Sequence, residues 1–439
     1  MQKRIGNVRW FIAILLGIGI VINYLDRVNI SVAAKPLIAE YHLSNADLGI
    51  ILSSFLWSYT ILQIPVGTLL DKFGVKWLVR IGTILWSLAT FMTALVSGFG
   101  LIILSRVLLG IAEAPAFPGA SKATGYWFPT RERGLSTSAF DAAAKFSSVI
   151  GVPLVAFVVT IYGWRGGFFV TGILSILYAA AFWIWYRDPK ESKRVSEEEY
   201  RYIVEGGAQP ENAVPTNSLA NLGYMLRQRK VWGLTLGFTA YNYSFYLFLL
   251  WLPPYLETQL HLTVLSTGWY AIIPWIVATL TDIFIGGWLV DRLIRSGFEP
   301  TRVRKTLLTI GMLLGITVIG AAFTRSATIA IIWISIALGG LAFSAPIGWS
   351  IPALIAPKGS VGTVGSIMNF VSNAAGIAAP ILAGIVADST GSFALNFIIA
   401  AAILVAGILC YIFLLGKIEQ IEAPPTVAEA PYEEMRKAS

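Results

Sequence analysis

The sequence predicts an all-α membrane protein in which twelve transmembrane helices form two pseudo-symmetric six-helix bundles. Three observations predict this class: the composition, the spacing of long apolar runs, and a motif that occurs at the same place in each half. Hydrophobic residues make up 56% of the 439 residues and charged residues only 13%, whereas a soluble domain carries about 25% charged residues. The mean hydropathy is +0.71. An ordinary soluble enzyme, a disordered chain and a coiled coil are therefore excluded.

Metal and cofactor chemistry is not expected. The chain has 1 cysteine and 2 histidines, which excludes a disulfide framework and a cysteine-based zinc site and argues against a histidine-rich metal centre. The sequence lacks the His-Glu-x-x-His, Gly-x-Ser-x-Gly and Gly-rich phosphate-binding motifs of common enzyme families. We therefore expect no enzyme activity, no metal and no cofactor apart from a coupling ion. A membrane-embedded enzyme and a non-transporting sensor are the minor alternatives.

A membrane-spanning helix needs about 20 apolar residues. Twelve candidate spans lie at residues 9–34, 46–70, 77–97, 99–123, 134–160, 165–187, 230–256, 266–291, 306–324, 327–352, 361–386 and 392–416. The first resembles a signal peptide because Lys3, Arg4 and Arg9 precede it. No small-residue cleavage site follows, and the run continues into a polar segment at 23–27, so we interpret it as a span.

The basic residues predict the orientation of the chain, because cytoplasmic loops carry an excess of Lys and Arg. With a cytoplasmic N-terminus, the basic residues inside are Lys72, Lys76, Arg80, Arg131, Arg133, Arg292, Arg295, Arg302, Arg304 and Lys305, and those outside are Lys35, Arg165 and Arg325. We therefore expect a multi-pass protein of the cell (inner) membrane with both termini cytoplasmic. Topology and anionic lipid explain the net charge of +8. A nucleic-acid partner is not expected, because the basic residues do not form one face.

The longest polar stretch divides the chain between the sixth and seventh spans. We predict an N-terminal six-helix bundle at 1–187, a cytoplasmic linker at 188–229, a C-terminal six-helix bundle at 230–417 and a cytoplasmic tail at 418–439. Within the linker, Ser196 and Glu199 have the spacing of a capping box and predict a short amphipathic helix.

The second span of each half ends in the same motif. The two copies are Gly67-x-x-x-Asp71-Lys72 and Gly287-x-x-x-Asp291-Arg292. Duplicated halves are typical of secondary transporters. The glycine is expected to let neighbouring helices approach closely, and the aspartate to face a helix N-terminus or a basic partner. A chance match between two loops is the alternative.

The first copy extends to Gly74, Lys76 and Arg80, and in this form it resembles the loop signature of the major facilitator superfamily. Four further motifs resemble the anion:cation symporter family, which includes proton-coupled galactonate, glucarate and hexuronate permeases. They are Asn23-Tyr24-Leu25-Asp26-Arg27, Arg106-x6-Glu113-Ala114-Pro115-x-Phe117-Pro118, Trp127-Phe128-Pro129-x-x-Glu132-Arg133 and Asn369-Phe370-x-x-Asn373-x-x-Gly376. The resemblance covers nearly the whole chain and implies the major facilitator fold with transport by alternating access.

Ionisable residues inside the predicted spans are the first site candidates, because their burial is costly. They are Asp26, Arg27, Arg106, Glu113, Asp141, Lys145 and Asp282. Arg27 shares a helix face with Tyr24, and its planar fork suits a carboxylate substrate. Asp26 points about 100° away and is free to contact another helix. A structural ion pair of Asp26 with Arg27 or Arg106 is the alternative.

Arg106 and Glu113 lie seven residues apart, on one face of the fourth span and about 10 Å apart along its axis. Each is therefore expected to meet a neighbouring helix, and Asp26 is the expected partner of Arg106. Pro115 follows Glu113 and loosens the helix there. Burial favours the protonated form of a carboxyl group, so Asp26 and Glu113 are predicted to carry the coupling protons. A fixed polar network around Glu113 is the alternative.

Asp141 and Lys145 lie four residues apart and are expected either to neutralise each other or to offer the substrate a second cation. In the sugar-acid permeases, a substrate-contacting Gln is common at the position of Ala144. Its replacement here, followed by Lys145, suits a smaller, more acidic or aromatic carboxylate. Asp282 is expected to be a packing or gating carboxylate.

Uncharged polar and aromatic residues complete the predicted substrate site. They are Tyr24, Tyr59, Asn242, Tyr246, Trp349, Ser350 and Asn373, and the resemblance implies substrate contacts for Tyr59 and Asn373. Packing and interhelical hydrogen bonds are the alternative. Pro253 and Pro254 are expected to break the seventh span on its outer side.

Together these observations predict a monomeric secondary transporter that imports an organic carboxylate, such as a hexonate, aldarate or hexuronate, with protons. An exchanger or symporter for a small dicarboxylate or an aromatic acid is the alternative. Arg27 and Lys145 would bind the anion, and Asp26, Glu113 and Arg106 would couple protons. The resemblance assigns gating roles to Gly67, Asp71, Gly74, Lys76, Arg80, Gly287, Asp291 and Arg292.

Overall fold

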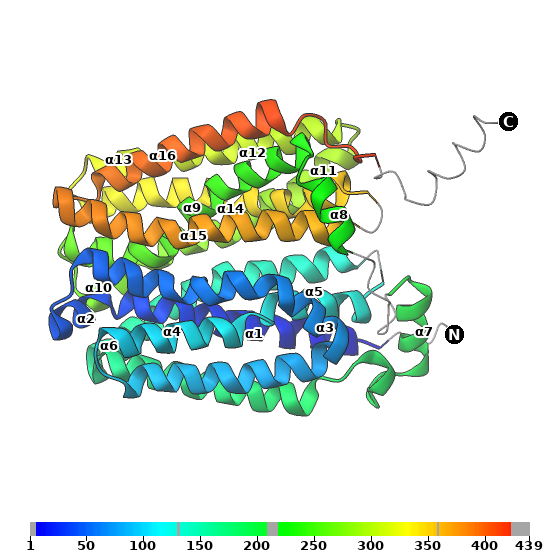
Figure 1. Cartoon of the computed structure of the whole chain (residues 1–439), viewed down its shortest axis with the longest axis horizontal. Helices are drawn as coiled ribbons and strands as arrows, with labels where there is room; N and C mark the ends of the chain where they lie inside the picture. Colours follow the sequence, from blue (N-terminus) through cyan, green and yellow to red (C-terminus); the bar gives the residue numbers. More distant parts are fainter. Residues whose placement is uncertain (1–5, 130–131, 209–217, 358–359, 423–439) are drawn as a thin grey trace.

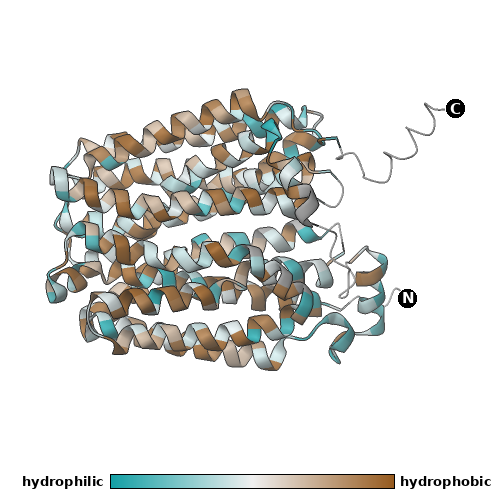
Figure 2. Ribbon diagram, in the orientation of Figure 1, coloured by the Kyte–Doolittle hydropathy of each residue, from teal (hydrophilic) through white to brown (hydrophobic). Residues whose placement is uncertain are grey.

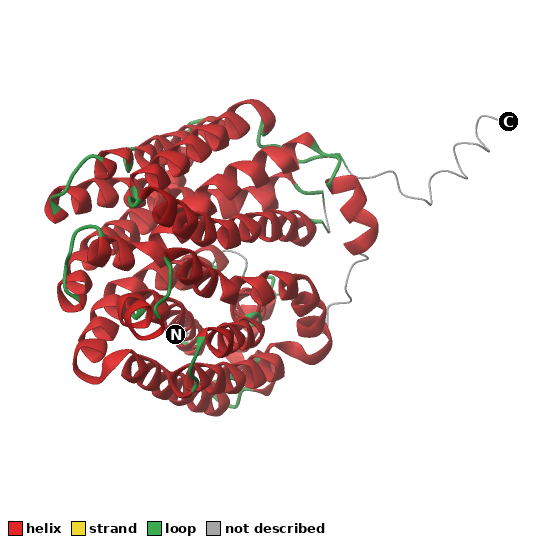
Figure 3. Ribbon diagram, turned by 60° about the vertical axis from the view of Figure 1, so that its left-hand side comes forward, coloured by secondary structure: helices red, strands yellow, loops and turns green. Residues whose placement is uncertain are grey.

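The computed structural model describes residues 6–129, 132–208, 218–357 and 360–422, and all of the regular structure in these ranges is helical (Figure 3). The helices of the first half are α1 (Val8–Val32), α2 (Ala34–Tyr41), α3 (Asn45–Leu95), α4 (Phe99–Glu113), α5 (Ala116–Trp127) and α6 (Arg133–Trp185). A 3-10 turn η1 (Pro189–Glu191), α7 (Glu197–Glu205) and α8 (Ser218–Met225) follow. The helices of the second half are α9 (Arg229–Thr258), α10 (Val264–Thr281), the π-helical turn η2 (Asp282–Leu289), α11 (Val290–Arg295), α12 (Pro300–Ile316), α13 (Ile319–Ala322), α14 (Ala327–Ile355), α15 (Val361–Thr390), α16 (Ala394–Leu409) and a second π-helical turn, η3 (Cys410–Leu414).

The predicted all-α membrane fold is confirmed. Nine segments of the described chain are long and apolar enough to cross a membrane. The segment in α6 contains two crossings, because the chain reverses at Gly163 (φ +72°). Likewise, α3 reverses at Gly74 (φ +74°). The nine segments thus hold ten crossings, and the part of α3 before Gly74 and α9 bring the number to twelve within the described residues. Only glycine adopts such positive φ angles at little cost.

The two halves of the chain lie side by side. Figure 1 shows α1–α6 as one group and α9–α16 as the other, with the first and last described residues at the same end of the molecule and α7 beside the start of the chain. Apolar residues run along the long helices and polar residues gather at both ends (Figure 2). Large apolar side chains such as Ile14, Phe157 and Phe413 are exposed on the sides, as expected where lipid covers them. The chain is therefore a multi-pass membrane protein.

Prolines were expected to break the seventh span and to loosen the fourth, and only the fourth is interrupted. Pro253 and Pro254 do not break the seventh span, because α9 continues through both to Thr258. This expectation was wrong, since membrane helices tolerate proline where neighbouring groups compensate for the lost hydrogen bond. The fourth span is interrupted after Glu113, where α4 ends and α5 begins at Ala116.

The linker helix α7 is held against the start of α1. As predicted, the Ser196 side chain caps α7 by accepting a hydrogen bond from the Glu199 amide (3.1 Å). The Glu199 carboxylate does not return to Ser196, and instead accepts hydrogen bonds from the amides of Val8 (3.2 Å) and Arg9 (3.1 Å). The reciprocal hydrogen bond of a capping box is therefore absent, and the Glu199 carboxylate instead caps the N-terminus of α1. A helix N-terminus favours a negative charge at this position.

The two halves meet tightly at the end opposite the chain termini. A β-carbon on Gly49 of α3 would lie 2.4 Å from the carbonyl oxygen of Pro380, and one on Gly384 of α15 would lie 2.2 Å from that of Asn45. The Asp388 carboxylate of α15 accepts hydrogen bonds from the backbone amides of Asn45 (3.0 Å) and Ala46 (2.7 Å). A carboxylate of one half thus caps a helix N-terminus of the other, and this end is closed.

We expect Gly384→Val to keep this end from closing, because a side chain cannot fit against the backbone of Asn45. Transport should fall at least about tenfold. A cysteine placed at Tyr246 in a Cys410→Ser background should react faster with an impermeant thiol reagent added from this end. The control is Gly17→Val, because a β-carbon at Gly17 meets no described atom within 4 Å. Equal labelling and transport in the two variants would contradict the prediction.

A second contact at the same end lies within the first half. The Trp164 indole donates a hydrogen bond to Glu40 Oε2 (2.6 Å), and Arg165 Nη1 donates one to Oε1 (2.8 Å). The Trp164 hydrogen bond, with the Arg165 contact, holds the pKa of Glu40 below its ordinary value of 4.5.

We expect Glu40→Gln to lower the stability of the purified protein at neutral pH by at most about 1 kcal/mol, since the pair is partly exposed. A carboxylate whose folded pKa is lowered stabilises the fold above its unfolded pKa and loses this contribution as the pH falls through the folded value. The melting temperatures of the variant and the wild type should therefore converge in acid. Glu205→Gln, at the exposed end of α7, is the control. A difference that persists in acid would contradict the assignment.

Candidate substrate-binding site

A cavity of about 90 Å³ lies between the two halves of the molecule. It is lined by Tyr24, Arg27, Tyr59, Phe117, Asp141, Ala144, Lys145, Phe238, Tyr241, Asn242, Phe245, Tyr246, Ala345, Trp349, Asn369 and Asn373. Eight of the nine residues predicted to bind substrate are among them. The exception is Ser350, whose hydroxyl donates a hydrogen bond to the Ile347 carbonyl (2.7 Å) and does not line the cavity.

Arg27 of α1 is buried in an aromatic surround. Its guanidinium carbon lies 4.6 Å from the ring centre of Tyr24, 4.5 Å from that of Phe55 and 4.6 Å from that of Tyr59. Its Nε donates to Glu113 Oε2 at 3.3 Å, while Nη2 has no hydrogen-bond partner among the described residues. A buried donor of this kind is costly unless a ligand satisfies it, and a carboxylate would do so.

Two acids accompany Arg27: Glu113 accepts its hydrogen bond, and Asp26 precedes it in α1. Both acidic side chains are fully buried. Glu113 Oε1 and Asp26 Oδ1 have no hydrogen-bond partner within the described part of the chain. Asp26 Oδ2 accepts a hydrogen bond from Ser175 (2.9 Å). Buried acids with one unsatisfied oxygen are suited to exchange between charged and neutral forms.

Arg106 does not form the predicted carboxylate pair. Its Nη1 donates to the backbone carbonyl of Asp26 (3.2 Å), so the expectation of a direct side-chain bond was wrong. The seven-residue spacing places Arg106 about two helical turns from Glu113, at a level where it reaches the backbone carbonyl of Asp26 in α1. The Arg106 charge still interacts with the charges of Asp26 and Glu113, so Arg106 is placed to favour the ionised form of either acid.

Lys145 connects the two halves. Its Nζ lies 2.7 Å from Asp141 Oδ2 in the same helix and 2.9 Å from Asp282 Oδ2 in η2. The predicted Asp141–Lys145 pair is therefore present, and Asp282 is its third member. Only the Asp141 and Lys145 members of this cluster line the cavity.

The polar residues of the second half form a chain of amides. Asn373 Nδ2 donates to Asn369 Oδ1 (3.1 Å), and Asn369 Nδ2 donates to Gln63 Oε1 in α3 (3.3 Å). Asn242 Nδ2 donates to the Ser372 carbonyl (2.8 Å). The Asn373–Asn369 bond lies within α15, whereas the other two cross between helices and link α15 to α3 of the first half and to α9.

The loop motif of the first half lies at the end of the molecule where the described chain begins and ends. Arg80 is buried and donates to the carbonyls of Trp183 (2.9 Å) and Tyr186 (3.2 Å) at the end of α6. Lys76 pairs with Glu191 in η1 at 2.5 Å. The side chain of Asp71 lies outside the described residues. The first copy of the motif therefore ties the second and third crossings to the end of the sixth.

The glycines of the motif do not bring helices together in this structure. A β-carbon on Gly67 would meet no described atom within 4 Å, and one on Gly287 only the carbonyl oxygen of Asp282 at 4.0 Å. The expectation of close approach at these positions was wrong. In the second copy, the Arg292 guanidinium carbon lies 5.0 Å from the Trp288 ring centre, while the backbone carbonyl of Asp291 accepts a hydrogen bond from Arg295 Nε (3.2 Å).

The sequence analysis did not select the phenylalanines of the cavity. Phe117, Phe238 and Phe245 line it together with Tyr241, so half of the lining residues are aromatic. Nothing distinguishes these phenylalanines from the many that face lipid, since aromatic residues occur throughout the spans. Phe238 and Phe245 differ in one respect, because they recur with Tyr241 and Asn242 at intervals of three and four along α9. Phe117, in α5, has no such signal.

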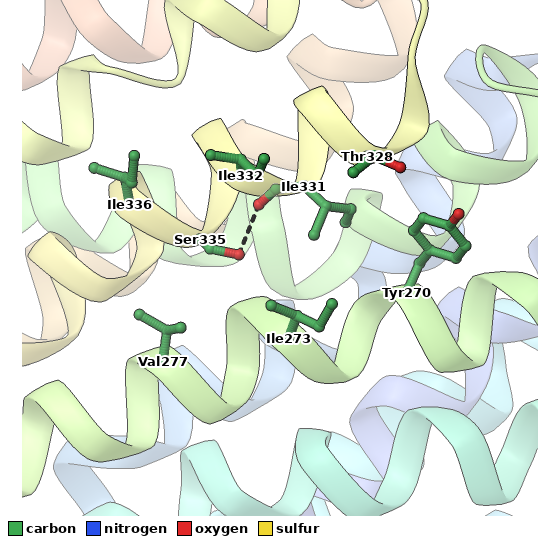
Figure 4. Close-up of a pocket in the computed structure, with 8 residues that line it drawn as sticks. All are labelled: Tyr270, Ile273, Val277, Thr328, Ile331, Ile332, Ser335 and Ile336. Carbon is green, nitrogen blue, oxygen red and sulfur yellow. Dashed lines mark hydrogen bonds between the residues drawn. The ribbon is translucent and has the colours of Figure 1, made fainter.

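A larger cavity, of about 270 Å³, lies between α10 and α14 (Figure 4). It is lined by Tyr270, Ile273, Val277, Thr328, Ile331, Ile332, Ser335 and Ile336. The Ser335 hydroxyl already donates to the Ile331 carbonyl (2.6 Å). Since no charged side chain lines it, this apolar cavity is unsuited to an anion, and lipid chains are its natural occupants.

A polar central cavity between two helical bundles of a multi-pass membrane protein is the arrangement of a secondary transporter. The chain belongs to the Major Facilitator Superfamily, whose profile matches residues 16–380. It is therefore a transport protein and not an enzyme.

Relatives of known name support this assignment. The chain is 44% identical to the uncharacterized transporter YybO of Bacillus subtilis (strain 168), over 96% of this chain and 97% of that protein. It is 34% identical to a probable L-galactonate transporter of Escherichia coli (strain K12), over 94% and 90% of the two chains. It is 31% identical to the probable galactarate/D-glucarate transporter GarP of the same strain, over 96% and 98%.

Among solved structures, a bacterial homologue of the human lysosomal transporter Spinster, in an inward-facing and occupied conformation, matches with a TM-score of 0.73. The match covers 93% of this chain and 97% of that one at 16% identity, so it shows the fold alone. The chain is thus a major facilitator protein homologous to sugar-acid transporters.

Proposed function

We propose that this protein is a proton-coupled symporter that imports an organic carboxylate, of the sugar-acid class, across the inner cell membrane. The observation that carries the proposal is the buried pair of Arg27, which lines the cavity, and Glu113, with Arg27 Nη2 unsatisfied among the described residues. Relatives named as galactonate and galactarate/D-glucarate transporters support the substrate class. The basic loops support cytoplasmic termini.

In this proposal, protonation of Glu113 weakens its ion pair and releases the Arg27 fork. Arg27 then holds the substrate carboxylate, because two parallel hydrogen bonds to a planar anion match its geometry. Tyr24, Tyr59 and Asn373 contact the polar body of the substrate. Asp26 binds the second proton, and Arg106 favours the ionised form of both acids after release. Protonation and closure of the halves are thereby linked.

The cavity also favours a second candidate substrate. Eight aromatic residues line it, and Ala144 and Lys145 occupy the place where the sugar-acid family commonly has an amide. Aromatic rings pack well against an aromatic acid, and Lys145 suits a compact or dianionic one. An aromatic or dicarboxylic acid is therefore the alternative substrate class, and exchange the alternative mode.

The test uses the purified protein in liposomes that contain a pH-sensitive dye. A panel of hexonates, aldarates, hexuronates, dicarboxylates and aromatic acids is added outside, with no imposed gradient. Internal acidification driven by one acid, and lost in Asp26→Asn, is the expected result. Uptake of labelled acid without acidification would overturn the proton coupling, and silence across the panel would overturn the substrate class.

A further inference from the structure

The cluster of Asp141, Lys145 and Asp282 joins the two halves inside the membrane. Asp141 and Lys145 belong to α6, whereas Asp282 begins η2 in the other half. The Lys145 ammonium contacts both carboxylates, at 2.7 and 2.9 Å. The side chains of Lys145 and Asp282 are each 4% exposed and that of Asp141 is 17% exposed. One buried cation therefore faces two acids.

The charges of this cluster do not balance. Elsewhere in the site, Arg27 and Arg106 offset Asp26 and Glu113, but Lys145 alone faces two carboxylates. Among the described helices packed on the cluster, α10 and α14 contain no acidic or basic residue, and Tyr241 of α9 and Tyr24 of α1 face it. Arg27 of α1 lines the same cavity but is paired with Glu113. An uncompensated buried charge is costly, and two carboxylates that share a site repel each other.

The Asp282 carboxylate has a close but poorly aligned contact with Lys145. Its Oδ2 lies 2.9 Å from Lys145 Nζ but has no hydrogen-bond partner among the described residues, whereas the Lys145 bond to Asp141 has hydrogen-bond geometry. A proton on one of the two acids would remove the excess negative charge and make the cluster neutral. Asp282 also opens a π-helical turn, a deformation that is frequent at functional sites.

We propose that Asp141 and Asp282 together bind one proton, at a site distinct from Asp26 and Glu113. This proton exchanges with water when the two halves of the molecule separate at the cluster. Separation breaks the Lys145–Asp282 contact and leaves Lys145 paired with Asp141. Asp282 then releases its proton to water when its environment opens. The transport role rests on the proposed symport, but the binding of the proton does not.

The test is a pH-induced infrared difference spectrum of the full chain in lipid, which reports protonated carboxyl groups through their carbonyl stretching band. Asp141→Asn and Asp282→Asn should each reduce this band by one carboxyl group, because each leaves a single acid paired with Lys145. The double variant should lose no more than either single variant, since only one proton is shared. Glu205→Gln, at an exposed position, should leave the band unchanged.

No loss in either single variant, or losses that add in the double variant, would overturn the shared site. In liposomes, Asp282→Asn should lower the ratio of protons to substrate by one, and an unchanged ratio would overturn the transport role. If the wild type moves substrate without protons, the proposed symport fails, while the infrared result still decides whether the site exists. If uptake is proton-driven but the band is unaffected, only this inference fails.

Discussion

Arg27→Lys is expected to weaken substrate binding by roughly 10- to 100-fold, which corresponds to about 1.4–2.8 kcal/mol. A lysine keeps the charge but loses the fork, and charge-assisted bidentate bonds are the strong ones. It also loses the planar contact with Tyr24, Phe55 and Tyr59, whose ring centres lie 4.5–4.6 Å from the guanidinium carbon. Because the positive charge remains, the partner of Glu113 is not removed and the fold should persist.

The measurement is the half-saturation concentration for counterflow exchange in liposomes, which needs substrate binding but no net proton movement. The matched control is Arg165→Lys, since Arg165 is a partly exposed arginine that pairs with Glu40 (2.8 Å) at the closed end, away from the cavity lining. Its affinity should stay at the wild-type value. If Arg27→Lys also retains that value, Arg27 is not a substrate ligand.

Asp26→Asn and Glu113→Gln are expected to abolish uphill uptake while counterflow exchange continues. Each amide resembles the protonated acid in shape and cannot release a proton, so the cycle can exchange bound substrate but cannot couple to a gradient. Accumulation against a gradient should fall at least about 100-fold, and the exchange rate by less than about tenfold. Both acids are fully buried, and Glu113→Gln removes the ion-pair partner of Arg27, as protonation of Glu113 does in the proposed cycle.

Labelled substrate is measured in both assays across a range of external pH. Glu205→Gln, which removes an exposed acid in α7, should leave uptake and its pH dependence unchanged. A Glu113→Gln protein that still concentrates substrate with normal pH dependence would show that Glu113 does not couple protons. If only Asp26→Asn loses uphill uptake, coupling requires that acid alone.

Much of the candidate site was predictable because it depends on local spacing. Tyr24 and Arg27 are three residues apart on one helix, and both reach the cavity. Asn242 and Tyr246 are four apart and do the same. The turn between the second and third crossings was predicted only as the gap between the spans 46–70 and 77–97, and the chain reverses there at Gly74. For the two residue pairs, one helix and its period carry the information.

Contacts between helices distant in sequence were not predictable in this way. The Arg106 side chain reaches the backbone of α1 and not the expected carboxylate. Gly49 and Gly384 lie close to the backbone of the opposite half at the closed end, whereas Gly67 and Gly287 of the repeated motif make no such contact among the described residues. Which glycine is covered depends on how two helices cross and on the conformation of the transporter, and neither follows from the periodicity of a single helix.

The sequence by itself determined the class of protein and the helices that carry the buried charges, because apolar length and the cost of burying charge are properties of each segment. Only the tertiary structure decided the pairing of these charges. It brought Asp282 from the second half to Lys145 in the first (2.9 Å) and surrounded Arg27 with rings from α1 and α3. The physical reason is that these energies depend on distance and desolvation across the interface between the halves, which exists only once the helices have packed.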